Sequence, residues 1–454
     1  MFIGREKELA LLQQDYMGQA AMVYGKRRVG KTTLIQKALK SSSYRTVYFE
    51  CLKGTMQDNI SGFVQELVRA KILPVPLNFG TLQDVFAYLN ALPEKIVVVI
   101  DEYPYLKAMN DSATVDSIFQ NIIDNRLVNI ELILSGSHIG MMKDALQEKN
   151  ALYGRFAVTI KLNELNYLEA AKFYPDKTPY DKVAHYAVFG GSPFVNQALR
   201  PTATLRENIV STILNPVSAV YLYASQLLLS DYSVKINAER IFAVIGNGKK
   251  RYSEIEDKLD VKKTGNLAKQ MKPLRDLEII SRNYPINKLN DSKKSTFEIN
   301  DNLLRFYFTF IYKNASALQV LGAEAFYDEY VAPTLTDFIS RRFEGICRDY
   351  FSLQVRSGKL KGVRNIGSYY YDDPVHRKNG EFDVALELAD GYAIYEAKYY
   401  AQPMTLDEIH REAQQVANIK ELAVKQLGFI AINGFVEQEK PYTYLDGNDI
   451  FAGM

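Results

Sequence analysis

The sequence predicts an α/β protein in which a parallel sheet carrying a phosphate-binding loop is followed by a helical lid, a winged helix and a second α/β domain. Three observations predict it. Up to about residue 160, short apolar runs without polar alternation are separated by helical patterns, as in a parallel sheet covered on both faces. Residues 236–300 have the pattern of a helix, a helix-turn-helix and a hairpin, the order of a winged helix. Residues 331–454 again mix helices with strands.

The composition excludes several protein classes. The 454 residues have a net charge of only +2, which gives no globally basic surface. Two distant cysteines, Cys51 and Cys347, allow neither a disulfide framework nor a zinc ribbon. No apolar run approaches the ~20 residues of a membrane span, and the N-terminus has no signal-peptide pattern. We therefore expect a cytoplasmic protein with no membrane partner.

Four strands are expected in the first domain, at residues 20–24, 46–49, 96–100 and 131–135, and a helix at 31–40. Between the first strand and this helix, Gly25-Lys26-Arg27-Arg28-Val29-Gly30-Lys31-Thr32 fits the P-loop pattern G-x4-G-K-[ST]. The loop N–H groups and the helix N-terminus, which also includes Thr33, would bind phosphate oxygens. Lys31 would reach the β- and γ-phosphates and Thr32 would hold Mg²⁺, so ATP and Mg²⁺ are the predicted cofactors.

Two further strand ends carry polar residues. Asp101 and Glu102 follow the third strand. A carboxylate there can hold Mg²⁺, and the next acid can polarise the attacking water, although an ordinary charged turn is the alternative. After the fourth strand, Ser135 or Ser137 is a candidate sensor of the γ-phosphate, with a plain turn equally compatible.

These motifs resemble a known family when three more are added: Phe2-Ile3-Gly4-Arg5-Glu6, Leu152-Tyr153-Gly154-Arg155 and Gly190-Gly191-Ser192-Pro193. Over roughly residues 1–230 the chain resembles the archaeal and bacterial ATPases of the STAND branch, which are related to AAA+ proteins. The resemblance implies that residues 2–5 contact the adenine, that Gly191 and Pro193 close over the nucleotide, and that the protein is a homo-oligomer. It also implies that Arg155 lies near the γ-phosphate of its own or a neighbouring subunit, whereas chemistry alone favours a surface ion pair.

Charge is segregated along the chain. Residues 240–294 contain 14 Lys or Arg and 7 Asp or Glu, a local net charge of +7. Basic residues lie on the third expected helix of this segment, at 266–277, and in the wing between the two hairpin strands. Their placement suits contacts with DNA phosphates more than base readout. The alternative is a winged helix that serves only as a lid or an oligomer contact. The predicted DNA-binding residues are Lys262, Lys263, Lys269, Lys272, Arg275, Lys293 and Lys294.

Acidic residues lie on two expected strands of the last domain, at 382–388 and 392–397. Asp383 and Glu396 can bind a divalent cation, and Lys398, on the same strand face as Glu396, can orient or deprotonate an attacking water. Glu344, beside the apolar stripe of an expected helix at 333–351, is the predicted third ligand. A simple edge ion pair is the alternative for Glu396 and Lys398.

The order helix Glu, strand Asp, strand Glu-x-Lys resembles the PD-(D/E)xK core of restriction-endonuclease-like domains, with Phe382 in place of the name-giving Pro. More narrowly, residues 301–454 resemble DUF234, a domain of unknown function appended to such ATPases. The resulting division is an ATPase core at 1–160, a helical lid at 161–235, a winged helix at 236–300, a helical connector at 301–330 and a nuclease-like domain at 331–454.

Three functions are compatible with this organisation. The first is an enzyme that hydrolyses ATP, binds DNA through the winged helix and cuts a phosphodiester in its C-terminal domain. The second is a STAND-type molecular switch whose C-terminal fold only binds a partner. The third is a transcription regulator built on the winged helix.

Overall fold

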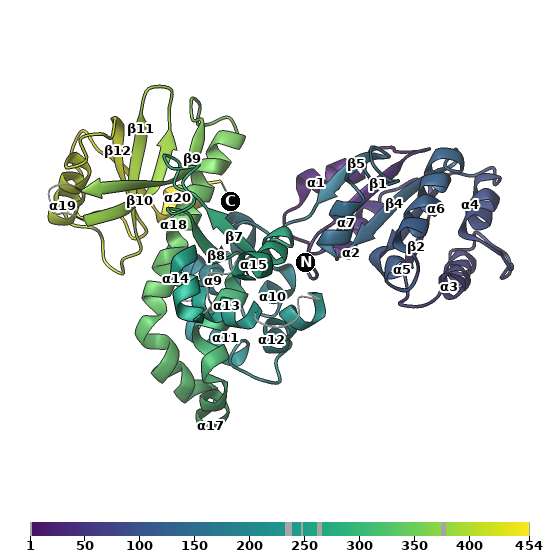
Figure 1. Ribbon diagram of the computed structural model, residues 1–454, viewed down its shortest axis with the longest axis horizontal. Coiled ribbons are helices and arrows are strands. Elements are labelled where there is room, and N and C mark those ends of the chain that lie inside the picture. The colour runs from purple at the N-terminus through teal and green to yellow at the C-terminus, as the bar shows by residue number, and fades with distance from the viewer. Residues whose placement is uncertain (1, 232–237, 247, 261–265, 374–377, 454) are drawn as a thin grey trace. The chain divides into compact units, whose positions relative to one another are not determined.

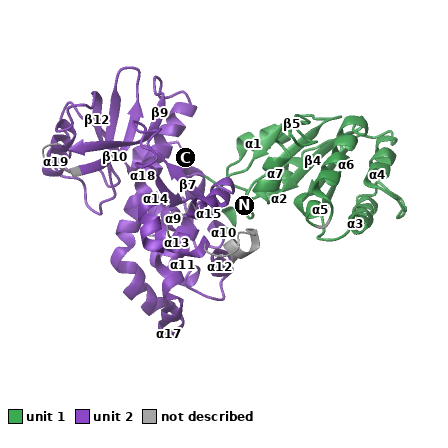
Figure 2. Cartoon of the chain, viewed as in Figure 1, with its two compact units in different colours: residues 1–165, 192–194 green, residues 166–191, 195–454 purple. Residues whose placement is uncertain are grey.

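The computed structural model describes residues 2–231, 238–246, 248–260, 266–373 and 378–453 (Figure 1). The chain forms two compact units, one of residues 1–165 with 192–194 and the other of residues 166–191 with 195–454 (Figure 2). Within the described ranges, no helix is both long and apolar enough to cross a bilayer.

The first unit is built on a parallel sheet with the strand order β2-β3-β4-β1-β5. The strands are β1 (Ala20–Tyr24), β2 (Arg45–Glu50), β3 (Ile96–Asp101), β4 (Ile130–Gly136) and β5 (Phe156–Lys161). The sequence predicted the first four. It missed β5 because this edge strand alternates exposed and more buried residues, whereas the prediction looked for continuous apolar runs.

Helices cover both faces of this sheet. Alternate residues of β1 divide between two cores: Ala21 and Val23 pack with α1 (Glu6–Leu12) and α2 (Lys31–Leu39), and Ala20 and Met22 pack on the opposite face. The helices of that opposite face are α3 (Met56–Arg69), α4 (Leu82–Asn90), α5 (Pro104–Met109), α6 (Ser112–Asn125) and α7 (Ile139–Asp144). Because all strands are parallel, the loops after β1, β3 and β4 emerge at one edge of the sheet.

The second unit begins with short helices: α8 (Tyr167–Ala171), α9 (Pro179–Phe189), α10 (Pro193–Gln197), α11 (Leu205–Ser211) and α12 (Ala219–Asp231). The sequence assigned this segment to a lid over the ATPase core. Within the second unit its helices contact the C-terminal part of the chain: the ring of Tyr180 stacks on Tyr399 with centroids 4.3 Å apart, and the Tyr167 hydroxyl donates to the Ile450 carbonyl at 2.9 Å. The assignment as a lid stays a prediction.

Residues 238–299 form three helices and a small antiparallel sheet of order β6-β8-β7. The elements are α13 (Ala238–Ile245), β6 (Lys250–Arg251), α14 (Tyr252–Leu259), α15 (Asn266–Asp276), β7 (Ile280–Asn283) and β8 (Thr296–Ile299). The three helices and the hairpin lie where the sequence predicted them, and β6 is an addition. An aromatic-rich helical stretch follows: α16 (Asn302–Phe306), η1 (Tyr307–Ile311), η2 (Tyr312–Asn314), α17 (Ala315–Phe326) and η3 (Tyr327–Val331).

The C-terminal part has a five-stranded mixed sheet of order β13-β12-β11-β10-β9, packed against the long helix α18 (Ala332–Arg356). Strands β9 (Asn365–Asp373), β10 (Lys378–Glu387) and β11 (Tyr392–Lys398) are antiparallel. Strands β12 (Val424–Ala431) and β13 (Thr443–Asp446) run parallel to β11. Helix α19 (Leu406–Ala417) connects β11 to β12, and α20 (Gly447–Phe451) follows β13.

A buried histidine makes the second unit sensitive to acid. Nδ1 of His185 lies 2.8 Å from the Asp181 carbonyl, and Nε2 lies 3.3 Å from the Asn208 side-chain amide, which fits the neutral ring. Burial lowers the pKa of His185 to about 4, although the Asp181 carbonyl opposes this shift. The unfolded chain therefore binds a proton near pH 6.5 that the folded chain rejects.

We expect stability to be full above pH ~6.5 and to fall by up to ~1.4 kcal/mol per pH unit as the pH drops from 6.5 towards 4. The measurement is urea unfolding of the wild type and of His185→Gln at pH 7.5 and pH 5. The variant should lose less stability between the two pH values. Equal losses in both proteins would contradict the assignment.

Candidate nucleotide site and C-terminal acidic site

The P-loop lies between β1 and α2, as predicted. Gly30 has φ 93°, in the left-handed region that glycine adopts at little cost, and it begins α2. At Gly25 a Cβ atom would lie 2.1 Å from the Leu162 carbonyl oxygen, so no larger residue fits without moving the backbone. Both glycines are therefore required by the path of the loop.

Lys31 is folded back into the loop. Its ammonium donates to the carbonyls of Gly25 and Lys26, both at 3.0 Å, and the residue is only 6% exposed. A buried ammonium encircled by a loop rich in N–H groups is a site for phosphate oxygens.

Beside Lys31, the Thr32 hydroxyl donates to the Asp101 carboxylate at 3.2 Å, and the Tyr48 hydroxyl donates to the same oxygen. Asp101 ends β3 and is buried. Burial, together with the Asp101 charge, raises the pKa of Tyr48, so its phenol remains a donor. A hydroxyl and a carboxylate at this distance are the hard oxygen ligands that Mg²⁺ prefers, so this donor set fits the predicted cofactor.

Glu102 follows Asp101 in an unusual backbone conformation, with φ 49°. Its carboxylate accepts from the Ser137 hydroxyl at 2.8 Å and from the Ser137 N–H at 3.2 Å. Ser135 is fully buried, and its hydroxyl has no hydrogen-bond partner among the described residues. Of the two serines the sequence offered, Ser137 is the one that lies beside the predicted water-polarising acid.

Two other predicted segments contact the P-loop. Arg5 is buried and donates to the carbonyls of Val29, at 3.3 Å, and Asn163. The Ser192 hydroxyl donates to the Arg28 carbonyl at 3.2 Å, and the Arg28 guanidinium lies 3.9 Å from the centroid of the Phe194 ring. These contacts attach Arg5 of the N-terminal motif to the nucleotide loop. They also attach residues 192–194, which directly follow Gly191, to the same loop.

The other residues predicted to bind nucleotide either contact neighbouring side chains or face solvent. The Phe2 ring packs on the α1–α2 core and lies under the Lys37 ammonium, 4.3 Å away, with Ile3 and Gly4 leading into Arg5. The Arg27 guanidinium donates to the Tyr105 hydroxyl at 2.9 Å, and Thr33 is exposed on the first turn of α2.

Arg155 lies away from the P-loop of its own subunit. It precedes β5, whose Phe156 pairs with Ala20 at the start of β1, while the P-loop follows Tyr24 at the other end. Five residues of strand, ~16 Å, separate the two edges. The guanidinium instead forms a two-pronged ion pair with Asp124, with N–O distances of 2.9 and 3.0 Å. Arg155 therefore does not lie at the P-loop of its own subunit; it forms the surface ion pair that chemistry alone favours, and a role towards a neighbouring subunit stays a prediction.

A second polar site lies in the C-terminal sheet. The β10–β11 register pairs Val384 with Tyr395, so one step further along the same register Asp383 is opposite Glu396. The β10–β9 register shifts between Phe382 and Ala385, which marks a β-bulge at Asp383. Bulges re-aim side chains next to functional sites, and this register shift includes Asp383, a predicted metal ligand.

Burial and neighbouring carboxylates raise the pKa values of these two carboxyls. The pKa of Asp383 is raised to about 7 by burial and by the Glu344 charge. That of Glu396 is raised to about 8 by burial and by the Asp383 charge. Buried acids pushed towards neutrality are typical of functional sites, because a bound cation would restore their charge.

Lys398 contacts both β11 and α19. Its ammonium lies 3.5 Å from Glu396 and 3.3 Å from Glu412. Burial alone would lower the pKa of Lys398, but Glu396, Glu412 and Asp383 together raise it. Lys398 is thus a cation, suited to orienting a water or stabilising negative charge. Whether Lys398 orients or deprotonates the water stays a prediction.

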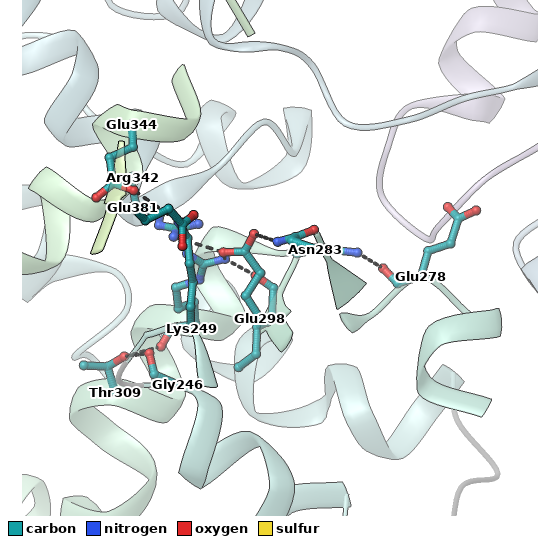
Figure 3. Close-up of polar contacts among 12 residues, drawn as sticks. Gly246, Lys249, Glu278, Asn283, Glu298, Thr309, Arg342, Glu344 and Glu381 are labelled. Carbon is teal, nitrogen blue, oxygen red and sulfur yellow. Dashed lines mark hydrogen bonds and ion pairs between the residues drawn. The ribbon is translucent and has the colours of Figure 1, made fainter. Parts of the chain in front are cut away.

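Glu344 is held by a lysine that the sequence did not single out. The Lys249 ammonium lies 3.3 Å from Glu344 and 3.6 Å from Glu381 (Figure 3). Across the described residues, no three His, Cys, Asp or Glu side chains form a group that could hold a metal ion. Asp383 and Glu396 provide a pair of oxygen donors, and the predicted third ligand is instead bound to Lys249.

The basic face of α15 is exposed. Lys269, Lys272 and Arg275 point away from the buried residues of the helix, such as Leu267 and Met271. Lys293 is also exposed, but Lys294 is not available as predicted: its ammonium donates to the Tyr370 hydroxyl at 2.5 Å and lies 3.9 Å from the ring centroid. Lys262 and Lys263 lie outside the described residues.

Sequence reasoning missed Glu412 and Lys249. Glu412 is three residues after Ile409 and four before Val416, both buried, so helical spacing on α19 was a usable signal. Lys249 follows Gly248 in a short loop, and nothing local indicates a partner 95 residues away on α18.

Two segments of the chain match known families. Residues 2–195 match the model of an ATPase domain predominantly from Archaea. Residues 307–414 match DUF234, described as archaeal and bacterial proteins of unknown function. The predicted archaeal ATPase domain and DUF234 are confirmed, over shorter ranges than expected, whereas the STAND branch and the nuclease core stay predictions. An uncharacterized protein of Methanocaldococcus jannaschii is 28% identical over 368 residues, covering 79% of each chain.

Similar solved structures are distant. A Walker-type ATPase of Pyrococcus abyssi has 18% identity and a TM-score of 0.49, covering 68% of this chain and 96% of that chain. The ORC2 protein of Aeropyrum pernix, in ADPNP and ADP complexes, has 11% identity and a TM-score of 0.47, covering 70% and 94%. The ORC1 protein of the same organism, in complex with DNA, has 14% identity and a TM-score of 0.37, covering 73% and 94%.

Proposed function

We propose that the protein hydrolyses ATP, and that its nucleotide state controls the binding and metal-dependent cleavage of DNA. The observation that carries the proposal is the group at the carboxyl edge of the first sheet. There Lys31 is enclosed by the P-loop, Thr32 contacts Asp101, and Glu102 is held by Ser137. The match of residues 2–195 to an ATPase domain supports the same activity.

Each residue of this group has a distinct role. Lys31 binds the terminal phosphates and stabilises the charge that develops during transfer. Glu102 orients and polarises the attacking water, and Ser137 fixes its carboxylate. Thr32 and Asp101 would hold Mg²⁺, which would neutralise the phosphate charge. Arg5 and Ser192 fix the loop from both sides.

DNA binding is assigned to residues 236–300 as a winged helix. Its basis is the exposed row Lys269, Lys272 and Arg275 on α15, which can neutralise phosphates without reading bases. Binding of this kind weakens steeply with salt, by roughly one unit of logarithmic slope per phosphate contact.

Cleavage is assigned to the C-terminal sheet as a PD-(D/E)xK-like site. Asp383 and Glu396 would hold a divalent cation, which would activate the scissile phosphate. Lys398, kept cationic by Glu396 and Glu412, orients the attacking water beside that phosphate.

A second function is favoured by one specific observation. Lys249 is ion-paired with Glu344, and among the described residues no three carboxylates form a group that could hold a metal ion. A STAND-type switch, in which nucleotide state changes a partner contact without phosphodiester turnover, needs no assembled metal site. In both functions Arg155 would act on a neighbouring subunit, which supports a homo-oligomer.

The deciding experiment is a cleavage assay on plasmid and labelled oligonucleotides in Mg²⁺ or Mn²⁺, with and without ATP. It compares the wild type, Lys398→Ala and the matched control Lys425→Ala, which removes a lysine paired with Asp390 on the surface. Cleavage should be lost in Lys398→Ala, by about 100-fold or more, and kept in the control. Absence of cleavage by the wild type, or equal cleavage by all three, would leave the switch as the function.

A further inference from the structure

A cavity of about 170 Å³ lies in the first unit, at the edge of the parallel sheet where β3 and β4 begin. Its wall is formed by the ends of α1 and α2, the loop after α2, and residues near the start of β3 and β4. The P-loop follows β1 at the opposite edge of the sheet and shares no residue with the cavity. The volume is roughly six times the ~30 Å³ that one water occupies, which is room for a short aliphatic chain. We call it the Glu131 cavity, after the buried carboxylate in its wall.

This carboxylate has no cation beside it. Glu131 is only 5% exposed and lines the cavity. Among the described residues, no lysine, arginine or histidine contributes to the lining. The unpaired polar atoms that the described residues enclose completely do not include the Glu131 oxygens, so a ligand in the cavity can reach them.

The groups that act on Glu131 agree with a missing counter-ion. Burial raises the pKa of Glu131 to about 7; the Tyr16 N–H opposes this rise, and the Asp15 charge adds to it. The charge of Lys95 is felt by Asp15, the exposed carboxylate of the lining, but not by Glu131. An ionised carboxylate is costly to bury without a partner, and a cation in the cavity would supply that partner.

The rest of the lining suits an aliphatic amine. Leu12, Ala38, Val97 and Ile133 are buried members of the apolar core on this face of the sheet, so they offer a surface to methylene groups. The last turn of α2 ends in the wall, where the negative end of the helix dipole favours a cation. Asp15 lies at the exposed rim, where it can meet a second positive charge.

We propose that the Glu131 cavity binds a short aliphatic amine, with its ammonium on the Glu131 carboxylate and its methylene groups on the apolar wall. The ligand is a monoamine or a diamine whose second ammonium meets Asp15, since both present the same primary ammonium. A metal ion fits less well, because within the described part of the chain no three His, Cys, Asp or Glu side chains gather in a group that could hold one. The site goes beyond the proposed ATP hydrolysis and DNA cleavage and does not depend on them.

The test is titration calorimetry on the full chain, without nucleotide, using butylamine, 1,4-diaminobutane and the uncharged 1-butanol. Butylamine should bind the wild type, and 1-butanol should bind about tenfold more weakly or less, because it brings no charge to Glu131. Glu131→Gln keeps the size of the side chain and should weaken butylamine binding by about tenfold or more. The matched control is Glu148→Gln, which removes an exposed carboxylate outside the lining.

A second variant tests the site without altering a buried residue. Ser43 is exposed at the mouth of the cavity. Ser43→Lys therefore places a cation there and should weaken amine binding by about three- to tenfold. Its control, Ser117→Lys, adds the same charge at an exposed position of α6 outside the lining and should leave binding unchanged.

The two amines distinguish the two kinds of ligand. Tighter binding of 1,4-diaminobutane that falls to the butylamine value in Asp15→Asn identifies a diamine, and equal binding of both amines identifies a monoamine. The proposal is overturned if neither amine binds the wild type, or if 1-butanol binds as tightly as butylamine. Equal amine binding by Glu131→Gln and Glu148→Gln, or by Ser43→Lys and Ser117→Lys, also overturns it, whatever the result for ATP hydrolysis or DNA cleavage.

Discussion

Replacing Lys31 with alanine should reduce ATP turnover by about 100- to 1000-fold. The Lys31 ammonium is 6% exposed and bonded to the carbonyls of Gly25 and Lys26, so it is already placed where phosphate oxygens enter the loop. Its loss removes a preorganised positive charge from a site where water screens charge weakly. The measurement is phosphate release under saturating ATP, with nucleotide affinity measured separately.

The matched control is Lys40→Ala, which removes an exposed lysine just after the end of the same helix. Its turnover should equal that of the wild type. If Lys31→Ala hydrolysed ATP at the wild-type rate, the P-loop could not be the site of turnover.

Replacing Glu102 with glutamine should separate hydrolysis from binding. The Glu102 carboxylate is bonded to Ser137 at the end of the neighbouring strand. The amide keeps the size of the side chain but cannot accept a proton from water, so hydrolysis should fall by about 100-fold or more. ATP affinity should remain within about threefold of the wild-type value, because Lys31, Thr32 and Asp101 are intact.

The readouts are a single-turnover hydrolysis rate and an equilibrium nucleotide titration. Glu94→Gln is the control, because Glu94 forms a surface ion pair with Arg45 at 3.0 Å and lies before β3. Joint loss of binding and hydrolysis in Glu102→Gln would mean that Glu102 supports the loop structure and has no separate role towards water.

The parts of the fold that could be predicted from sequence are those specified by local patterns. The apolar runs of β1 and β3 and the spacing of the P-loop motif can each be recognised from consecutive residues. The β5 strand was missed because an edge strand with one exposed face has no such run. The sequence predicted that Asp383 and Glu396 would act together on a cation. It could not predict the register shift at Asp383, because this shift depends on the pairing of β10 with β9.

The remaining errors come from contacts that are distant in sequence. Lys249 meets Glu344 across 95 residues, and Lys294 meets Tyr370 across 76, so neither contact leaves a periodic or compositional signal. The position of Arg155 could not be predicted for another reason. The motif identifies the arginine but does not show at which edge of the sheet it lies. That position follows from the parallel pairing of β5 with β1.

The position of Arg155 also constrains how subunits would assemble. Lys31 and Arg155 lie at opposite edges of one sheet, so a subunit would donate its arginine with one edge and accept a neighbour's arginine at the other. A two-fold dimer would have to bring both edges of each sheet into a single interface. Head-to-tail contacts need only one edge at a time and leave the second free for the next subunit, which favours a closed ring or a helical filament.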